Sequence, residues 1–126
     1  MSLEITLLQD YSQVLKAAAD PGRARILKML EEGELSVLQL MEVLGTGQST
    51  VSSHLAVLRK AGLVRDRQEG RWAYYALSDR KQNPYAMPIL AMLLGWLDDD
   101  PQVRADRRKL AALLKSRPDA AGLPDG

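Results

Sequence analysis

Two helical patterns joined by a linkage of three residues, and followed at once by a β-hairpin pattern, leave few folds open to this chain. A capping box, Ser36 with Gln39 three residues later, predicts where the first of these helices begins. After Gly45-Thr46-Gly47 a second helix is predicted to run to Lys60 or Ala61. Two helices this close together, the second with a polar leading turn, are typical of a helix-turn-helix.

The chain changes its hydrophobic period after Gly62, the glycine that ends the second helix. Segments 63–67 and 71–77 are rich in β-branched and aromatic residues, and Gln68-Glu69-Gly70 between them is a glycine-containing turn. This pattern predicts a two-stranded hairpin. A helix-turn-helix followed by a hairpin is a winged helix.

Helical periodicity also flanks this central part. Apolar residues at helical spacing predict a helix over about 4–18. Asp20-Pro21, an N-cap followed by proline at the first helical position, opens another over about 21–32. Further apolar runs predict a helix over 85–97 and a last one over about 102–116.

Positive charge is concentrated in the middle of the chain, although the net charge is only +1. Residues 47–80 carry six basic and three acidic side chains, whereas residues 1–46 carry four basic and seven acidic ones. A local basic face matters more for phosphate binding than the overall sum does. The distribution therefore favours an anionic partner for the helix-turn-helix and the hairpin.

Short and medium polar groups crowd the start of the helix that follows Gly47. Hydroxyl and amide groups there can meet base edges and phosphates, and a helix N-terminus itself favours phosphate. The alternative is that they only cap and solvate the helix start. The candidate DNA-contacting residues of this helix are Gln48, Ser49, Thr50, Ser52, Ser53, His54 and Arg59.

Two further candidates, on the hairpin, and His54 carry alternatives of their own. Arg67 and Arg71 flank the hairpin turn and can reach the phosphate backbone or the minor groove, unless the hairpin tip is merely solvated. His54 is the only histidine, and a DNA contact or a structural hydrogen bond is favoured over a pH switch.

Three segments, in this order, resemble the arsenic-repressor (ArsR) family of winged-helix regulators. They are Ala17 to Leu27, Gln48 to Val64 and Arg67 to Tyr75, within a match that covers about residues 10–78. The resemblance implies a dimeric repressor whose fourth helix enters the major groove. His54 stands where the family often has the second of two consecutive histidines, and Ser53 replaces the first.

The resemblance also argues against a metal sensor. One family site uses two cysteines in a Glu-Leu-Cys-Val-Cys pattern, where this chain has Glu34-Leu35-Ser36-Val37-Leu38. Another uses histidines of the C-terminal helices, and no histidine follows His54. Without cysteine a soft or borderline metal lacks its ligands, so we predict no metal site and no cofactor. An unknown small-molecule effector, a protein partner, or no effector at all stay open.

The run Asp98-Asp99-Asp100 has two interpretations. Three carboxylates can bind a hard cation such as Mg²⁺ or Ca²⁺. They can equally form a solvated helix end that caps the next helix, and we favour this second interpretation.

Self-association follows from the apolar surface of the terminal helices, which exceeds what one small core can absorb. A homodimer would bury it and place two recognition helices roughly 34 Å apart, one turn of DNA. A larger single core is the alternative. The residues that suggest the dimer are Leu7, Tyr11, Leu90, Leu94 and Trp96.

Together these patterns predict a mainly α protein with a small β-hairpin, a winged helix-turn-helix with N- and C-terminal dimerisation helices. We interpret residues 1–117 as one domain, with a DNA-reading part over about 20–78, dimerisation helices over about 4–18 and 85–116, and a flexible tail over 118–126.

Two other function classes compete with a DNA-binding repressor. An enzyme lacks a nucleophile–base pair, because Ser52, Ser53 and His54 are adjacent on one helix and point in different directions. A winged-helix protein-interaction module that never touches DNA is the more serious alternative. No apolar run reaches the roughly 18 residues of a membrane span and no secretory pattern opens the sequence, so we expect a cytoplasmic protein. The winged-helix pattern and the polar helix start predict double-stranded operator DNA as its partner.

Overall fold

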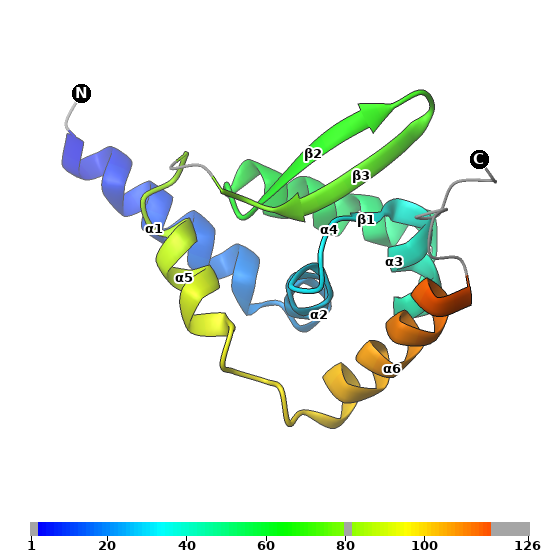
Figure 1. The fold of residues 1–126 in the computed structure, drawn as a ribbon. Coiled ribbons are helices and arrows are strands. Elements are labelled where there is room, and N and C mark those ends of the chain that lie inside the picture. Colours follow the sequence, from blue (N-terminus) through cyan, green and yellow to red (C-terminus); the bar gives the residue numbers. More distant parts are fainter. Residues whose placement is uncertain (1–2, 80–81, 117–126) are drawn as a thin grey trace.

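The computed structural model describes residues 3–79 and 82–116 and shows a mainly helical fold with one small antiparallel sheet. Helix α2 lies at the centre, with α1 and α5 on one side and α3 and α6 on the other (Figure 1). The elements are α1 (Leu3–Ala19), α2 (Pro21–Leu30), β1 (Leu35–Ser36), α3 (Val37–Leu44), α4 (Gln48–Lys60), β2 (Val64–Glu69), β3 (Trp72–Leu77), α5 (Ala86–Leu93) and α6 (Pro101–Ser116).

The predicted caps of the central helices are confirmed. The Asp20 carboxylate accepts a hydrogen bond from the Arg23 backbone N–H at 3.0 Å and opens α2. At the start of α3 the Ser36 hydroxyl accepts from the Gln39 N–H at 3.1 Å, and the Gln39 amide oxygen accepts from the Ser36 N–H at 2.9 Å. Gly45 ends α3 in the left-handed region, with φ of 68°. These local signals place α3 and α4 close together, as a helix-turn-helix requires.

The hairpin is more extensive than the sequence predicted. Strand β2 continues to Glu69, so the loop shrinks to Gly70 and Arg71, with φ of 63° at the glycine. The sheet also has a third strand, in the order β1-β3-β2, which pairs Leu35 with Tyr75. This two-residue strand was not predicted, because its partner lies forty residues away and its second residue is also a helix cap.

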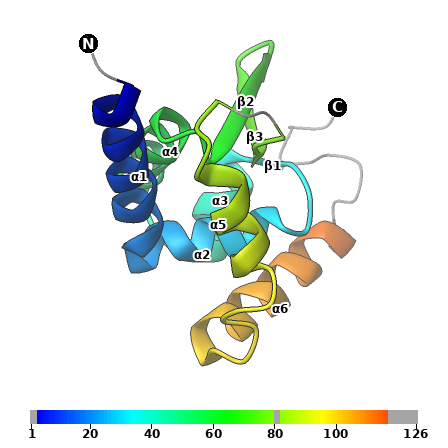
Figure 2. The same cartoon turned by 90° about the vertical axis from the view of Figure 1, so that its left-hand side faces the viewer.

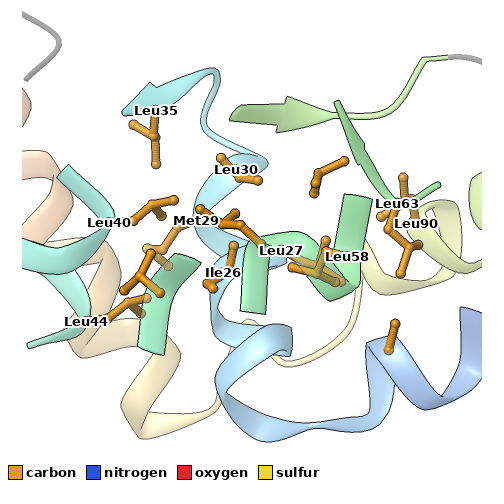
Figure 3. Close-up of a cluster of buried hydrophobic side chains, with 14 of the residues drawn as sticks. Ile26, Leu27, Met29, Leu30, Leu35, Leu40, Leu44, Leu58, Leu63 and Leu90 are labelled. Carbon is orange, nitrogen blue, oxygen red and sulfur yellow. The ribbon is translucent and has the colours of Figure 1, made fainter. Parts of the chain in front are cut away.

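The core forms where α2, α3, α4 and the sheet meet (Figure 3). Val51, Leu55 and Leu58 are fully buried and fix one face of α4 against the rest of the domain. One expectation was wrong: Leu90, one of the residues that suggested the dimer, is buried in the core instead of lying on a free surface. Leu38, on α3, is 42% exposed.

Helix α5 is shorter than predicted, ending at Leu93 and not near residue 97. The buried ammonium of Lys28 donates a hydrogen bond to the Leu93 carbonyl at 2.8 Å and binds the Asp98 carboxylate at 3.0 Å. Between these anchors Leu97 adopts a left-handed conformation, with φ of 67°. The polar contacts of α2 therefore end a helix that apolar periodicity alone would continue.

Carboxylates of the acidic run after α5 form ion pairs and a helix cap within the protein. Asp98 binds Lys28 and also Arg107, the latter at 2.9 Å. The Asp100 carboxylate accepts from the Val103 N–H at 3.0 Å and caps α6, as the capping interpretation predicted. The predicted tail over 118–126 lies outside the described residues. No described helix has both the length and the apolar character needed to cross a membrane.

Candidate nucleic-acid interface

The start of α4 presents a row of exposed polar side chains. Gln48, Ser49, Thr50, Ser52 and Ser53 are all exposed, while the fully buried Val51 and Leu55 hold the opposite face of the helix in the core. Core packing thus keeps the polar groups turned outward on a helix that cannot rotate without exposing its apolar face.

The first turn of α4 has no side-chain cap. Its N-cap residue is Gly47, which makes no side-chain hydrogen bond to the helix, and no other atom approaches within 4 Å of where its Cβ would stand. The hydroxyl groups that follow are therefore not engaged as the N-cap. Backbone N–H groups at an uncapped helix N-terminus are donors suited to an anionic ligand such as a phosphate.

His54 lies apart from this polar row. Its side chain is 24% exposed and points toward the start of α2, where its Nδ1 lies 3.4 Å from Nη1 of Arg23 and its Nε2 lies 3.9 Å from the Asp20 carboxylate. The structure thus places the predicted candidate in a structural hydrogen bond within the domain.

The two arginines of the hairpin have different surroundings. Arg67 donates to both oxygens of Glu34 at 2.9 Å and to Glu69 at 2.8 Å, and its guanidinium lies 4.5 Å from the centre of the Tyr74 ring. The hydrogen bonds that Arg67 donates to Glu34, and then to Glu69, raise the pKa of Arg67 above its ordinary value. Its charge is balanced inside the protein, and it ties the hairpin to the residue that precedes β1.

Arg71 occupies the hairpin tip and forms an ion pair with neither of these carboxylates. Its guanidinium lies 5.6 Å from the centre of the Trp72 ring, and no carboxylate of the described residues pairs with it. Its charge is free for an external anion. Arg59, at the last turn of α4, is 59% exposed and lies 4.0 Å from Asp66 across the edge of the hairpin.

The candidates therefore fall into three groups. The polar row and Arg59 share α4, Arg71 stands alone at the hairpin tip, and His54 and Arg67 bind partners within the domain. Those partners, Asp20, Arg23 and Glu34, were not predicted, because no local pattern joins residues more than thirty positions apart. Across the described ranges, no cluster of three or more His, Asp or Glu side chains is arranged to hold a metal ion.

Comparison with known proteins shows the same architecture elsewhere. The family model described as "Bacterial regulatory protein, arsR family" matches residues 20–66. The arsenical resistance operon repressor of Escherichia coli is 37% identical over 102 residues, which cover 79% of this chain and 83% of the repressor.

Solved structures agree with the sequence comparison. HlyU from Vibrio cholerae superposes with a TM-score of 0.62 at 34% identity, covering 77% of this chain and 98% of HlyU. The homodimeric winged helix-turn-helix DNA-binding domain of Mb0332 from Mycobacterium bovis has a TM-score of 0.64 at 29% identity, covering 75% of this chain and 85% of that domain.

Proposed function

The chain belongs to the arsR family of bacterial regulatory proteins, and we propose that it is a transcriptional repressor that binds operator DNA as a homodimer. Family membership confirms the resemblance found in the sequence and the winged helix-turn-helix fold. The observation that carries the proposal is the uncapped N-terminus of α4 with its row of exposed polar side chains. This combination favours DNA over a partner protein, because backbone N–H groups and short polar side chains suit phosphates and base edges.

The same geometry argues against a catalytic role for α4. Ser52 and Ser53 are exposed, whereas His54 is turned away from them toward Arg23 and Asp20. A hydroxyl nucleophile needs a base within hydrogen-bonding reach. We therefore assign these residues to DNA contact and domain structure.

Dimerisation is supported by apolar side chains left exposed on α1, on α5 and just after it. These two helices meet through the rings of Tyr11 and Tyr85, whose centres are 5.7 Å apart, and lie on one side of the molecule (Figure 2). We call this surface the α1–α5 face; its exposed apolar residues include Leu8, Tyr11, Met92, Leu94 and Trp96. Of the residues predicted from sequence, Leu7 is half-buried and Leu90 belongs to the core.

The test of the proposed function is operator discrimination. After an operator has been selected from random-sequence DNA with the wild-type protein, Gln48→Ala or Ser52→Ala should weaken operator binding by about tenfold for each half-site, the cost of one lost base contact per protomer. Affinity for random DNA should change little, because phosphate contacts remain. Fluorescence anisotropy measures both affinities. Lys109→Ala, on α6, is the control and should affect neither. A wild-type protein that selects no sequence would contradict the proposal.

Replacing the two hairpin arginines should have different effects on the salt dependence of DNA binding. Arg71→Ala should reduce the slope of log affinity against log salt by about one per protomer, since a phosphate contact is lost. Arg67→Ala should change that slope by well under one, because Glu34 and Glu69 already balance its charge. Titrations at several salt concentrations on random DNA measure the slopes. Equal slopes for the two variants would show that Arg67 also reaches the DNA.

Metal ions should leave operator binding unchanged. An effector releases DNA only if it binds one dimer conformation more tightly than the other. Ser36 and Leu38 stand where thiolates would be, and Asp98 and Asp100 are engaged in an ion pair and a cap. Operator affinity in stoichiometric Zn²⁺, Cd²⁺ or arsenite should therefore match a control of equal ionic strength. A loss of about tenfold, equivalent to 1.4 kcal/mol, would refute this prediction.

A further inference from the structure

One arginine of α2 joins the end of α1 to the middle of α4. The guanidinium of Arg23 donates from Nε to the Ala17 carbonyl at 2.8 Å and from Nη2 to the Lys16 carbonyl at 3.2 Å. These two carbonyls belong to the last turn of α1, whose C=O groups have no partner within the helix. Arg23 thus supplies the C-terminal hydrogen bonds of the N-terminal dimerisation helix.

The remaining edge of the same guanidinium faces α4. Its Nη1 lies 3.4 Å from Nδ1 of His54, and because a guanidinium only donates, this ring nitrogen is the acceptor. The other ring nitrogen, Nε2, lies 3.9 Å from the Asp20 carboxylate, which also accepts from the Arg23 backbone N–H. The charged groups around the imidazole are therefore Arg23 and Asp20, both from the first turn of α2 and its cap.

The backbone is also shaped to bring His54 this close. A Cβ added at Gly22 would stand 2.9 Å from Nε2 of His54 and 3.2 Å from the Asp20 carboxylate. Real Cβ atoms do not approach other atoms at the shorter of these distances, so only glycine leaves room for the imidazole here. Packing and hydrogen bonding converge on one position for His54.

We propose that Arg23 is the positioning residue that sets the angle of the recognition helix α4 relative to α1 in the dimer, acting through His54. The proposal rests on the proposed function, since it assumes that α1 helps to pair two protomers and that α4 reads DNA. Within one protomer, α1 and α4 pack against each other and against α2. The three helices therefore form one packed unit, and the hydrogen bonds of Arg23 connect all three.

The consequence concerns two half-sites bound at once. Hydrogen bonds to base edges tolerate only a few tenths of an ångström, because donor–acceptor distances fall within about 2.7–3.2 Å. A small change in the angle between α1 and α4 shifts each recognition helix relative to the two-fold axis. One half-site can still be occupied, but both cannot be matched together. Random DNA, held through phosphates, is insensitive to such a shift.

The test compares three DNAs: the full selected operator, a single half-site and random sequence. Arg23→Gln and His54→Ala should each weaken binding to the full operator by about tenfold or more, through loss of the second half-site's contribution. Affinities for the half-site and for random DNA should stay within about twofold of wild type. The double variant Arg23→Gln/His54→Ala should bind no more weakly than the weaker single variant, because both changes break one connection.

Two further variants keep the test decisive. Gly22→Ala retains the Arg23 charge and mainly displaces His54, whose Nε2 would lie 2.9 Å from the new Cβ, with the Asp20 carboxylate next at 3.2 Å, so it should reproduce the loss on the full operator even if Arg23→Gln fails to fold. Arg108→Gln, on the exposed side of α6, removes the same charge elsewhere and should leave the ratio of full-operator to half-site affinity unchanged. Thermal melts before each titration establish that the variants are folded.

Three results would overturn the inference: equal weakening on all three DNAs, additive losses in the double variant, or wild-type affinities for both single variants. Additive losses would mean that His54 contacts DNA independently of Arg23. If the wild-type protein itself failed to select an operator, the proposed function would be wrong. That result is distinct from the three above, which contradict only the role of Arg23.

Discussion

Lys28→Met should lower the free energy of unfolding by about 3 kcal/mol, at the lower end of the range for breaking a buried ion pair. The ammonium is fully buried and binds Glu31 at 2.9 Å, Asp98 at 3.0 Å and the Leu93 carbonyl at 2.8 Å. Methionine fills a similar volume but donates no hydrogen bond. The loss is not larger because Arg107 still binds Glu31 and Asp98 at 2.9 Å. Urea denaturation at a fixed protomer concentration measures the change.

The control for this variant is Lys109→Met, which removes an exposed lysine of α6 and should change stability by less than about 0.5 kcal/mol. The pH dependence gives an independent check. Hydrogen bonds from Lys28 and then Arg107 lower the pKa of Asp98 below its ordinary value. A lowered pKa stabilises the fold above the ordinary value of about 3.9, and this contribution is lost as the pH falls through the folded-state pKa.

The stability gap between wild type and Lys28→Met should therefore be constant near neutral pH and shrink below about pH 4. A gap that persists unchanged at acidic pH would assign the effect to the Leu93 carbonyl and not to the carboxylates. A variant as stable as wild type would show that the ion cluster gives no net stabilisation and serves only to end α5.

The parts of the fold that the sequence predicted correctly are those set by neighbouring residues. Asp20 and Pro21 begin α2, and Ser36 with Gln39 begins α3, because each cap is made within three positions. The end of α5 was wrong for the opposite reason. Leu94, Trp96 and Leu97 continue an apolar pattern, but the carbonyl of Leu93, the last residue of α5, is bound by Lys28, 65 positions earlier in the chain. No window of sequence contains both.

In the candidate site, too, features set by neighbouring residues could be predicted and those set by distant residues could not. Exposure of Gln48 and Ser52 follows from their helical spacing relative to Val51 and Leu55, so the polar row could be predicted from sequence. The charged partners of a long side chain could not be predicted from sequence in the same way. Arg67 and Arg71 are four positions apart and equally basic, yet only Arg67 meets carboxylates, because the unpredicted strand β1 brings Glu34 beside it.

Charging the α1–α5 face should abolish the dimer and most operator binding. Leu8 and Trp96 are 69% and 55% exposed, so Leu8→Glu/Trp96→Glu leaves the protomer core intact. In the dimer each glutamate would lose its hydration without a partner, and two-fold symmetry places every change at the interface twice. Sedimentation should show a folded monomer at micromolar concentration.

Operator affinity of this double variant should fall by about a hundredfold or more, because a monomer loses the effective concentration that links two half-sites. Half-site affinity should be retained, since α4 and the hairpin are unchanged. Leu38→Glu, an equally apolar but unrelated exposed position on α3, should sediment as wild type. If Leu8→Glu/Trp96→Glu remained dimeric, the protomers would have to pair through a different surface. The link from α1 through Arg23 to α4 would then no longer govern the spacing of the recognition helices.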